Sequence, residues 1–300
     1  MAADGTVDPE RAIDRINGVF GRHDGSRTLH AKGAFYAGTF TATPQAAALC
    51  RAGHLQGDPV PVRVRWSNGG GNPRNSDKGT DVRGMAVSFR LLDGTATDLL
   101  GQTAPRFPVR TPEAFLELVE AAGNPLKLPL FLARHPDAIP ATLANARAKA
   151  IVPPYSYAEA SYYPIHAYQW IAADGTQTWV RYRFTPQGGG DQRPAGRFEG
   201  RDRLREEILA RLAEHPVRHT LEVQTAGPGD DPHDPMSVWK GPWFDAGTIE
   251  VTGPDPDREQ GGEVVVFDPT RVVDGIELSD DPILRYRPAA YSASVSRRVG

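Results

Sequence analysis

The sequence predicts an α+β fold in which helices flank an antiparallel β core. Two observations support this class. Several closely spaced segments alternate apolar and polar residues with a period of two, which is typical of half-buried strands in a meander or barrel. Patterns with a helical period precede these strands, interrupt them and follow them, so strands and helices fall into separate runs.

Length and composition predict one large globular domain spanning residues 1–300, or two domains that pack closely together. A chain of 300 residues is long for one small core and short for three domains. The composition, 39% hydrophobic and 24% charged, is ordinary for a globular protein. The formal net charge of -3 gives no indication that nucleic acid or an anionic membrane is the main partner. We therefore expect neither as a partner.

Cysteine content and hydropathy exclude several kinds of protein and site. Cys50 is the one cysteine, which excludes an internal disulfide framework and any multi-cysteine metal site. No apolar run approaches the ~20 residues that a membrane span needs. The N-terminus lacks the apolar core of a signal peptide. We expect a soluble, cytoplasmic protein, or a periplasmic one if a leader was removed.

The N-terminal elements are a helix and three strands. Asp8, Pro9 and Glu10 combine an N-cap, a first-turn proline and an acidic first turn, and an apolar helical stripe follows them as far as Gly21. Alternation places His30 in the middle of the first strand. A hairpin turn is expected at 69–71, where three glycines follow the second strand. The predicted strands span residues 29–36, 60–67 and 81–89.

The remaining elements before the C-terminal segment are three helices and four strands. Thr111 is the expected N-cap of the first of these helices. The predicted helices span residues 112–122, 137–150 and 204–212. The predicted strands span residues 179–184, 217–223, 248–251 and 263–267. Residues 152–165 are expected to form a long, ordered loop, and 188–200 a hydrophilic insertion.

The C-terminal segment places one tyrosine between two arginines. Arg287, Tyr291 and Arg298 share a helical face, because spacings of four and seven bring side chains to the same side. Holding a phenol ionised at pH 7 needs roughly 4 kcal/mol, which an arginine and a bonded ferric ion can supply together. The alternative for this segment alone is a surface helix whose arginines serve solubility. Pro288 disfavours helical geometry before it, so the helix is expected to begin or kink there.

Five segments, in order along the chain, resemble the haem catalase family. They are His30–Ala34 (HAKGA) preceded by Arg27, Arg65-Trp66-Ser67, Asp81–Phe89 (DVRGMAVSF), Asp98–Arg110 (DLLGQTAPRFPVR) with Phe115 beyond it, and the Arg287, Tyr291, Arg298 spacing. The chain is similar to the small branch of catalase-related peroxidases, because it has no room for the N-terminal arm, wrapping segment and C-terminal helical region of full-length catalases. The resemblance implies an eight-stranded antiparallel β-barrel with flanking helices.

The resemblance also implies a haem b cofactor with ferric iron. The residues that would hold it are Arg27, Arg65, Phe115, Arg287, Tyr291 and Arg298. Tyr291 would be the axial iron ligand, as tyrosinate is in catalases, and Arg287 would stabilise its phenolate. The other three arginines resemble those that pair with the haem propionates. Phe115 would pack on the porphyrin face.

Three residues are the expected catalytic groups. Peroxide must lose a proton from one oxygen and gain one on the other before the O–O bond breaks heterolytically, and the imidazole of His30 could do both. Ser67 resembles the serine that orients this histidine and would fix its tautomer. Gln102 stands where catalases have an asparagine. Its longer side chain makes peroxidase turnover, which needs one peroxide and a donor, the stronger expectation than rapid disproportionation.

The sequence therefore predicts a haem peroxidase that reduces hydrogen peroxide or a small organic hydroperoxide with an organic electron donor, with or without weak catalase activity. Two alternatives stay open. One is a catalase-like haem enzyme that rearranges a fatty-acid hydroperoxide. The other is a haem carrier or sensor, which would need neither His30 nor Ser67. The expected partners are peroxide and a small organic reductant, and a homodimer is the assembly that we keep open.

Overall fold

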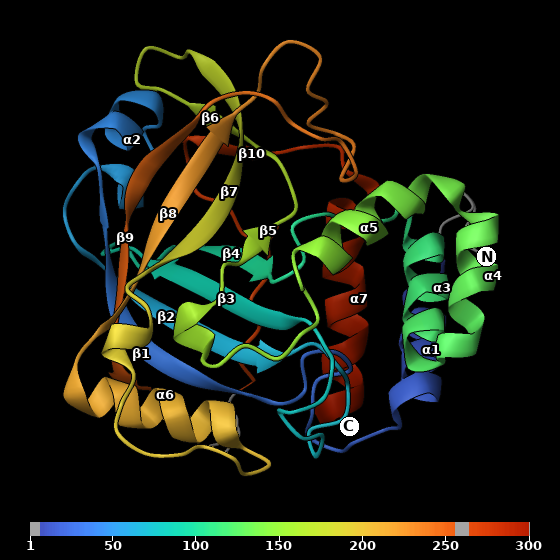
Figure 1. The fold of residues 1–300 in the computed structure, drawn as a ribbon. Coiled ribbons are helices and arrows are strands. Elements are labelled where there is room, and N and C mark those ends of the chain that lie inside the picture. Colours follow the sequence, from blue (N-terminus) through green and yellow to red (C-terminus); the bar gives the residue numbers. More distant parts are fainter. Residues whose placement is uncertain (1–6, 256–263, 300) are drawn as a thin grey trace.

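A single antiparallel sheet of ten strands forms the centre of the protein (Figure 1). The structure, a computed structural model, describes residues 7–255 and 264–299. The strand order is β10-β6-β7-β8-β9-β1-β2-β3-β4-β5. The strands are β1 (Gly33–Ala42), β2 (Val60–Asn68), β3 (Arg83–Arg90), β4 (Ala96–Gln102), β5 (Tyr163–Pro164), β6 (Tyr168–Ile171), β7 (Gln177–Gln187), β8 (Val217–Thr225), β9 (Trp243–Pro254) and β10 (Ile276–Leu278).

The sheet curls so that its eight strands from β7 to β5 face one another around a core. A single bridge between Tyr162, next to β5, and Phe184 of β7 joins the two ends of this eight-stranded run. The short strands β6 and β10 extend the sheet beyond it. The predicted α+β class is confirmed, and the expected strand count of eight is corrected to ten.

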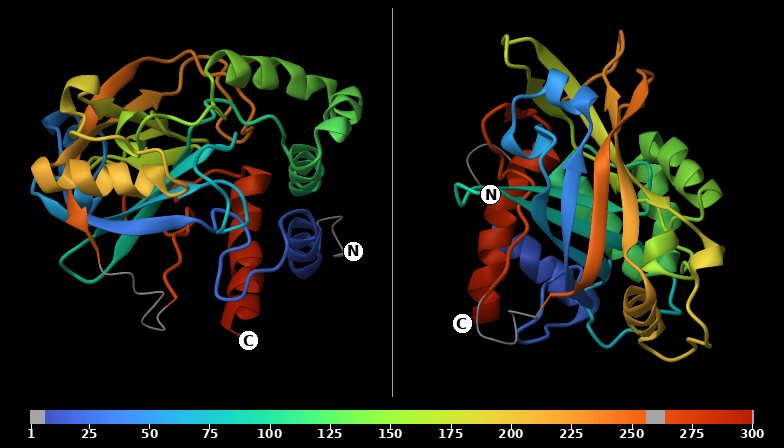
Figure 2. Two further views of the ribbon diagram at one scale, coloured as in Figure 1. Left: turned by 60° about the horizontal axis from the view of Figure 1, so that its bottom comes forward. Right: turned by 90° about the vertical axis from the view of Figure 1, so that its left-hand side faces the viewer.

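Seven α-helices are described, and most lie on one side of the sheet (Figures 1 and 2). They are α1 (Pro9–Phe20), α2 (Pro44–Leu49), α3 (Pro112–Gly123), α4 (Leu128–Arg134), α5 (Ile139–Arg147), α6 (Arg203–Glu214) and α7 (Pro282–Val299). Helices α1, α3 and α7 contact one another and form a layer beside the barrel. Within the described residues, no helix is both long and apolar enough to cross a membrane.

Helix starts follow the predicted caps. The Asp8 side chain accepts a hydrogen bond from the Arg11 amide at 3.0 Å at the start of α1, and Thr111 Oγ1 accepts one from Ala114 at 3.2 Å at the start of α3. The short helices α2 and α4 and the strands β4, β5, β6 and β10 were not predicted, because short elements offer too few residues for a periodic pattern.

Strand β2 is buried on both faces. Val64 and Trp66 point into the apolar core of the barrel and are 0% exposed. Arg65 and Ser67, on the opposite face, are each only 4% exposed. A face that carries arginine and serine would be solvated in a one-sided sheet, so its burial shows that a second layer covers the barrel here.

The strand predicted at 263–267 and a helix start at Pro288 are not what the structure shows. Residues 264–267 form no strand, and Glu263 lies outside the described residues. Phe267, one of the apolar residues that suggested a strand, instead stacks on Phe35 with ring centroids 6.0 Å apart. Helix α7 does not begin at Pro288 but runs through it from Pro282. Asp281 explains the early start, because its Oδ1 accepts hydrogen bonds from two amides of the first turn, at 2.8 and 3.3 Å.

Candidate functional site

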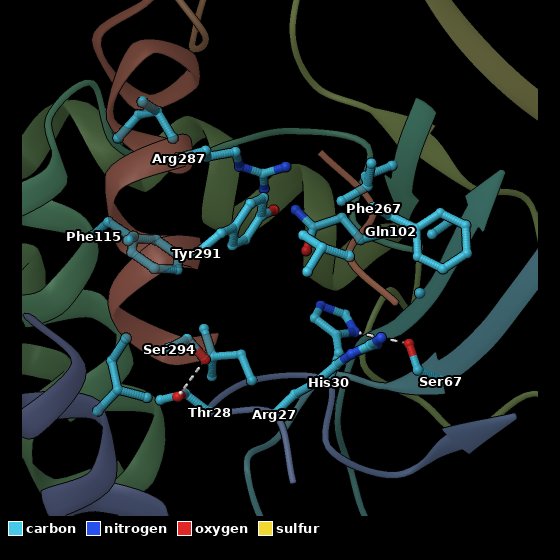
Figure 3. Close-up of a pocket in the computed structure, with 18 of the residues that line it drawn as sticks. Arg27, Thr28, His30, Ser67, Gln102, Phe115, Phe267, Arg287, Tyr291 and Ser294 are labelled. Carbon is cyan, nitrogen blue, oxygen red and sulfur yellow. Dashed lines mark hydrogen bonds between the residues drawn. The ribbon is translucent and has the colours of Figure 1, made fainter. Parts of the chain in front are cut away.

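One cavity of about 270 Å³ lies between the barrel and helix α7. All nine residues that the sequence singled out line this cavity. They are Arg27, His30, Arg65, Ser67, Gln102, Phe115, Arg287, Tyr291 and Arg298. Figure 3 shows open space between the ring of Tyr291 on one side and the ring of His30 on the other. The structure thus brings together residues that are up to 271 positions apart in the numbering.

His30 lies in a loop before β1, not in the middle of a strand as predicted. Its φ of 54° is in the left-handed region, which is incompatible with an extended strand. The amides of His30 and Ala31 donate to the carbonyl oxygens of Gly69 and Gly70, at 2.8 and 3.1 Å. These glycines begin the long connection 69–82 between β2 and β3, so the two strands form the expected hairpin but are joined by a long loop instead of a turn at 69–71. Period-two alternation cannot distinguish a strand from such a loop.

The imidazole of His30 is held on the barrel side of the cavity. Its Nδ1 lies 3.0 Å from Ser67 Oγ on β2. Burial, together with the charges of Arg65, Arg287 and Arg27, lowers the pKa of His30 to about 3. The ring is therefore neutral at pH 7 and can accept a proton.

Gly84 lets the His30–Ser67 pair form. It lies opposite Ser67 in the β2–β3 register and opposite Gln102 in the β3–β4 register. A Cβ at this position would lie 2.7 Å from His30 Nδ1 and 2.8 Å from Ser67 Oγ. The β-sheet thus places Gln102 and Ser67 around the histidine, with a glycine between them. The sequence motif contained Gly84, but only the pairing reveals its role.

Tyr291 lies on the opposite wall, on helix α7. Burial raises the pKa of its phenol, while the charges of Arg287 and Arg27 oppose that rise. The guanidinium of Arg287 points toward the phenol oxygen (Figure 3), and its buried Nη1 has no hydrogen-bond partner among the described residues. The protein alone therefore does not ionise Tyr291, and a cation bonded to its oxygen would complete the stabilisation.

Sequence patterns did not reveal the buried pair of His166 and Asp281. His166 Nδ1 lies 2.6 Å from Asp281 Oδ2, and the two side chains are 2% and 1% exposed. Burial lowers the pKa of His166 to about 4, against the opposing effect of Asp281 and with a further contribution from Arg287. Because the two residues are 115 positions apart, no local pattern connects them.

Three of the residues that line the cavity are the arginines Arg27, Arg65 and Arg298. The guanidiniums of Arg27 and Arg65 lie 5.6 and 5.7 Å from the ring centroid of Phe35. Arg27 and Arg298 also line a small adjoining recess. Beside it, the hydroxyl oxygens of Thr28 and Ser294 are 3.0 Å apart (Figure 3). A group that fills the cavity would meet the positive charge of these arginines, which suits carboxylates.

Comparisons with known proteins assign the family. The family model described as Catalase matches residues 20–300. The chain belongs to the catalase family. It is 46% identical over 303 residues to a catalase-related peroxidase of Mycolicibacterium paratuberculosis, with 99% of this chain and 96% of the relative covered. It is 30% identical to a catalase-related peroxidase of Synechococcus elongatus, with 98% and 89% covered. These relatives confirm the resemblance to the small branch.

A solved structure of a fungal catalase shows the same fold. It superposes on this catalase-family protein with a TM-score of 0.75 at 21% sequence identity. The alignment covers 96% of this chain and 62% of the fungal chain. Membership of the catalase family implies a haem cofactor.

The residues present fit a haem. In the described part of the chain, no group of three or more His, Cys, Asp or Glu is placed to hold a metal ion. A single phenol, that of Tyr291, suits an iron whose in-plane bonds come from a macrocycle. The positive charges of Arg27, Arg65 and Arg298 suit the propionates of a haem. Phe115, on α3, stacks with Phe107 at a centroid distance of 5.9 Å and adds apolar surface for a porphyrin.

Proposed function

We propose that this catalase-family protein is a haem peroxidase that reduces hydrogen peroxide or a small organic hydroperoxide with an organic electron donor. The observation that supports it best is a neutral imidazole, that of His30, facing a tyrosine across one cavity. The names of both relatives, catalase-related peroxidase, agree with this function.

Haem b with ferric iron, bound through Tyr291, would supply the redox chemistry. Arg287 would favour the phenolate form of Tyr291 by its charge. Arg27, Arg65 and Arg298 would pair with the propionates, because they bring positive charge to the cavity wall. Phe115 would contact the porphyrin face.

His30 would move the proton that peroxide reduction requires. In the tautomer whose Nδ1–H donates to Ser67 Oγ, the lone pair of Nε2 is available to accept a proton from one peroxide oxygen. The same nitrogen then returns the proton to the other oxygen as the O–O bond breaks. The low pKa of His30 keeps this nitrogen available across the neutral range. Gln102 would orient the peroxide through its amide.

A second candidate is rearrangement of a fatty-acid hydroperoxide. The observation in its favour is the apolar side of the cavity, to which α1 contributes Ile13 and Ile16 and α3 contributes Leu116. An acyl chain could pack against these side chains, and this reaction needs no external reductant.

Two measurements test the proposal. We expect turnover of hydrogen peroxide with a dye donor that exceeds turnover of a lipid hydroperoxide supplied alone, and the reverse order would favour the second candidate. His30→Ala should retain the haem absorption spectrum but lose roughly 10²–10⁴-fold in turnover, the usual contribution of a positioned acid–base group. Undiminished turnover would contradict the role of His30. A haem-binding protein with neither activity would be a carrier.

A further inference from the structure

Exposed apolar side chains are concentrated in one segment of the chain. Of the twelve large apolar side chains that the described residues expose, eight fall within residues 126–155. The most exposed are Leu126 at 88%, Leu130 at 53%, Ile151 at 52%, Leu143 and Val152 at 51%, and Ile139 at 40%. Burying such side chains removes apolar surface from water and lowers the free energy, so covering them would be favourable.

The helices α4 and α5 present these side chains outward. On α5, Ile139, Leu143 and Arg147 are exposed at spacings of four, while Ala141 is buried. On α4, Leu130 and Arg134 are exposed at the same spacing, while Phe131 packs into the core. Figure 1 shows α4 at the outer edge of the molecule, on the far side of α3 from the barrel, and α5 running from the top of the helical layer toward the barrel.

The same segment of the chain carries exposed basic side chains. Lys127, Arg134, Arg147 and Lys149 are all exposed, and none has a side-chain ion pair or hydrogen bond among the described residues. The one acidic residue in 122–155, Asp137, pairs with Arg110 at 2.5 Å. Four basic residues against one acidic residue give this segment a net charge of +3, although the whole chain carries -3.

Leucines interleaved with lysine and arginine on short exposed helices are typical of segments that lie in a membrane interface. We infer that this surface, the α4–α5 face, docks on an anionic lipid surface. Its apolar side chains enter the headgroup region and its four cations meet the lipid phosphates. The rest of the chain is acidic and is repelled by such a surface, so docking has one orientation. The net charge of the whole chain, -3, gives no indication of this positively charged segment.

Docking through this face brings the lipid close to the cavity. Helix α4 packs on α3, and α3 contributes Phe115 and Leu116 to the cavity wall. One helix therefore separates the docked surface from the site. The inference does not rest on the proposed reaction, because it uses only side chains outside the cavity.

Sedimentation with vesicles tests the inference on the full-length protein. We expect binding to vesicles of phosphatidylglycerol at low salt, loss of binding at high salt, and little binding to phosphatidylcholine. Lys127→Glu combined with Arg147→Glu should weaken partitioning by more than about tenfold, since each basic residue near an anionic surface contributes about 1 kcal/mol. The matched control is Lys78→Glu with Lys240→Glu, which reverses two exposed cations outside the face.

The apolar contribution is tested separately. Leu130→Ser with Leu143→Ser should reduce vesicle binding without a change of charge, whereas Leu92→Ser, at a position 102% exposed on the β3–β4 turn, should not. Equal losses in the control variants, or no binding to phosphatidylglycerol, would overturn the inference. So would a solution dimer that dissociates in Leu130→Ser, Leu143→Ser without any vesicle binding, because a second copy would then cover the face. Turnover with soluble substrates should be unchanged in every variant, which separates this inference from the proposed function.

Discussion

Gly84→Ala would test whether the barrel positions His30 for proton transfer. The added Cβ would lie 2.7 Å from His30 Nδ1 and 2.8 Å from Ser67 Oγ, whereas ordinary contact begins at 3.4 Å. The imidazole would have to retreat by roughly 0.7 Å to reach normal carbon contact distances. A displacement of about 1 Å can cost about 10²-fold in rate. We therefore expect a loss of turnover between about tenfold and a hundredfold, and a loss of stability of about 1–3 kcal/mol from overpacking.

The assay compares peroxide turnover with the haem absorption spectrum. Haem uptake should persist, because Tyr291 and Arg287 lie on α7 on the opposite wall of the cavity. Gly18→Ala is the matched control, since a Cβ on that residue of α1 meets nothing within 4 Å. It should keep full turnover and gain about 0.5–1 kcal/mol of stability from helix propensity. Wild-type turnover in Gly84→Ala would refute the reasoning, and loss of haem together with turnover would show that the disturbance is not confined to His30.

Two further predictions concern stability. Burial lowers the pKa of His54 to about 3, so the unfolded chain takes up a proton that the folded chain does not, and this contribution to stability falls as the pH drops from 6.5 toward 3. His54→Phe should reduce the slope of the unfolding free energy by about 1.4 kcal/mol per pH unit, measured by urea denaturation at pH 4.5 and 5.5; an unchanged slope would contradict it. Asp281→Ala should cost about 2–4 kcal/mol, because it removes the cap of α7 and leaves buried His166 without its acceptor. Asp281→Asn retains a capping oxygen and should cost less in the same denaturation experiment, and equal losses would show that the cap contributes little.

Local sequence patterns predicted the longer helices and strands but not the contacts between them. Caps and periodicity identified α1 and α3 because a helix of 12 residues repeats its pattern several times. The resemblance to catalases selected nine residues that line one cavity. It could not show that His30 occupies a loop with φ of 54°, since backbone strain leaves no trace in residue type. The pairing of His166 with Asp281 and the close approach at Gly84 depend on contacts between distant segments, which no spacing along the chain encodes.

The position of the cavity has a consequence for the lifetime of the protein. Helix α7 contacts α1 and α3 on its outer side, and Arg297 forms an ion pair with Asp14 there. Its inner side faces the cavity through Tyr291 and Arg287. A molecule bound in the cavity would contact both the helical layer and the barrel, so its binding would stabilise the protein against their separation. At a concentration a thousandfold above Kd, this stabilisation amounts to about 4 kcal/mol. Proteases that attack transiently opened chains would then spare the loaded protein. Haem supply would thereby set the abundance of this protein as well as its activity.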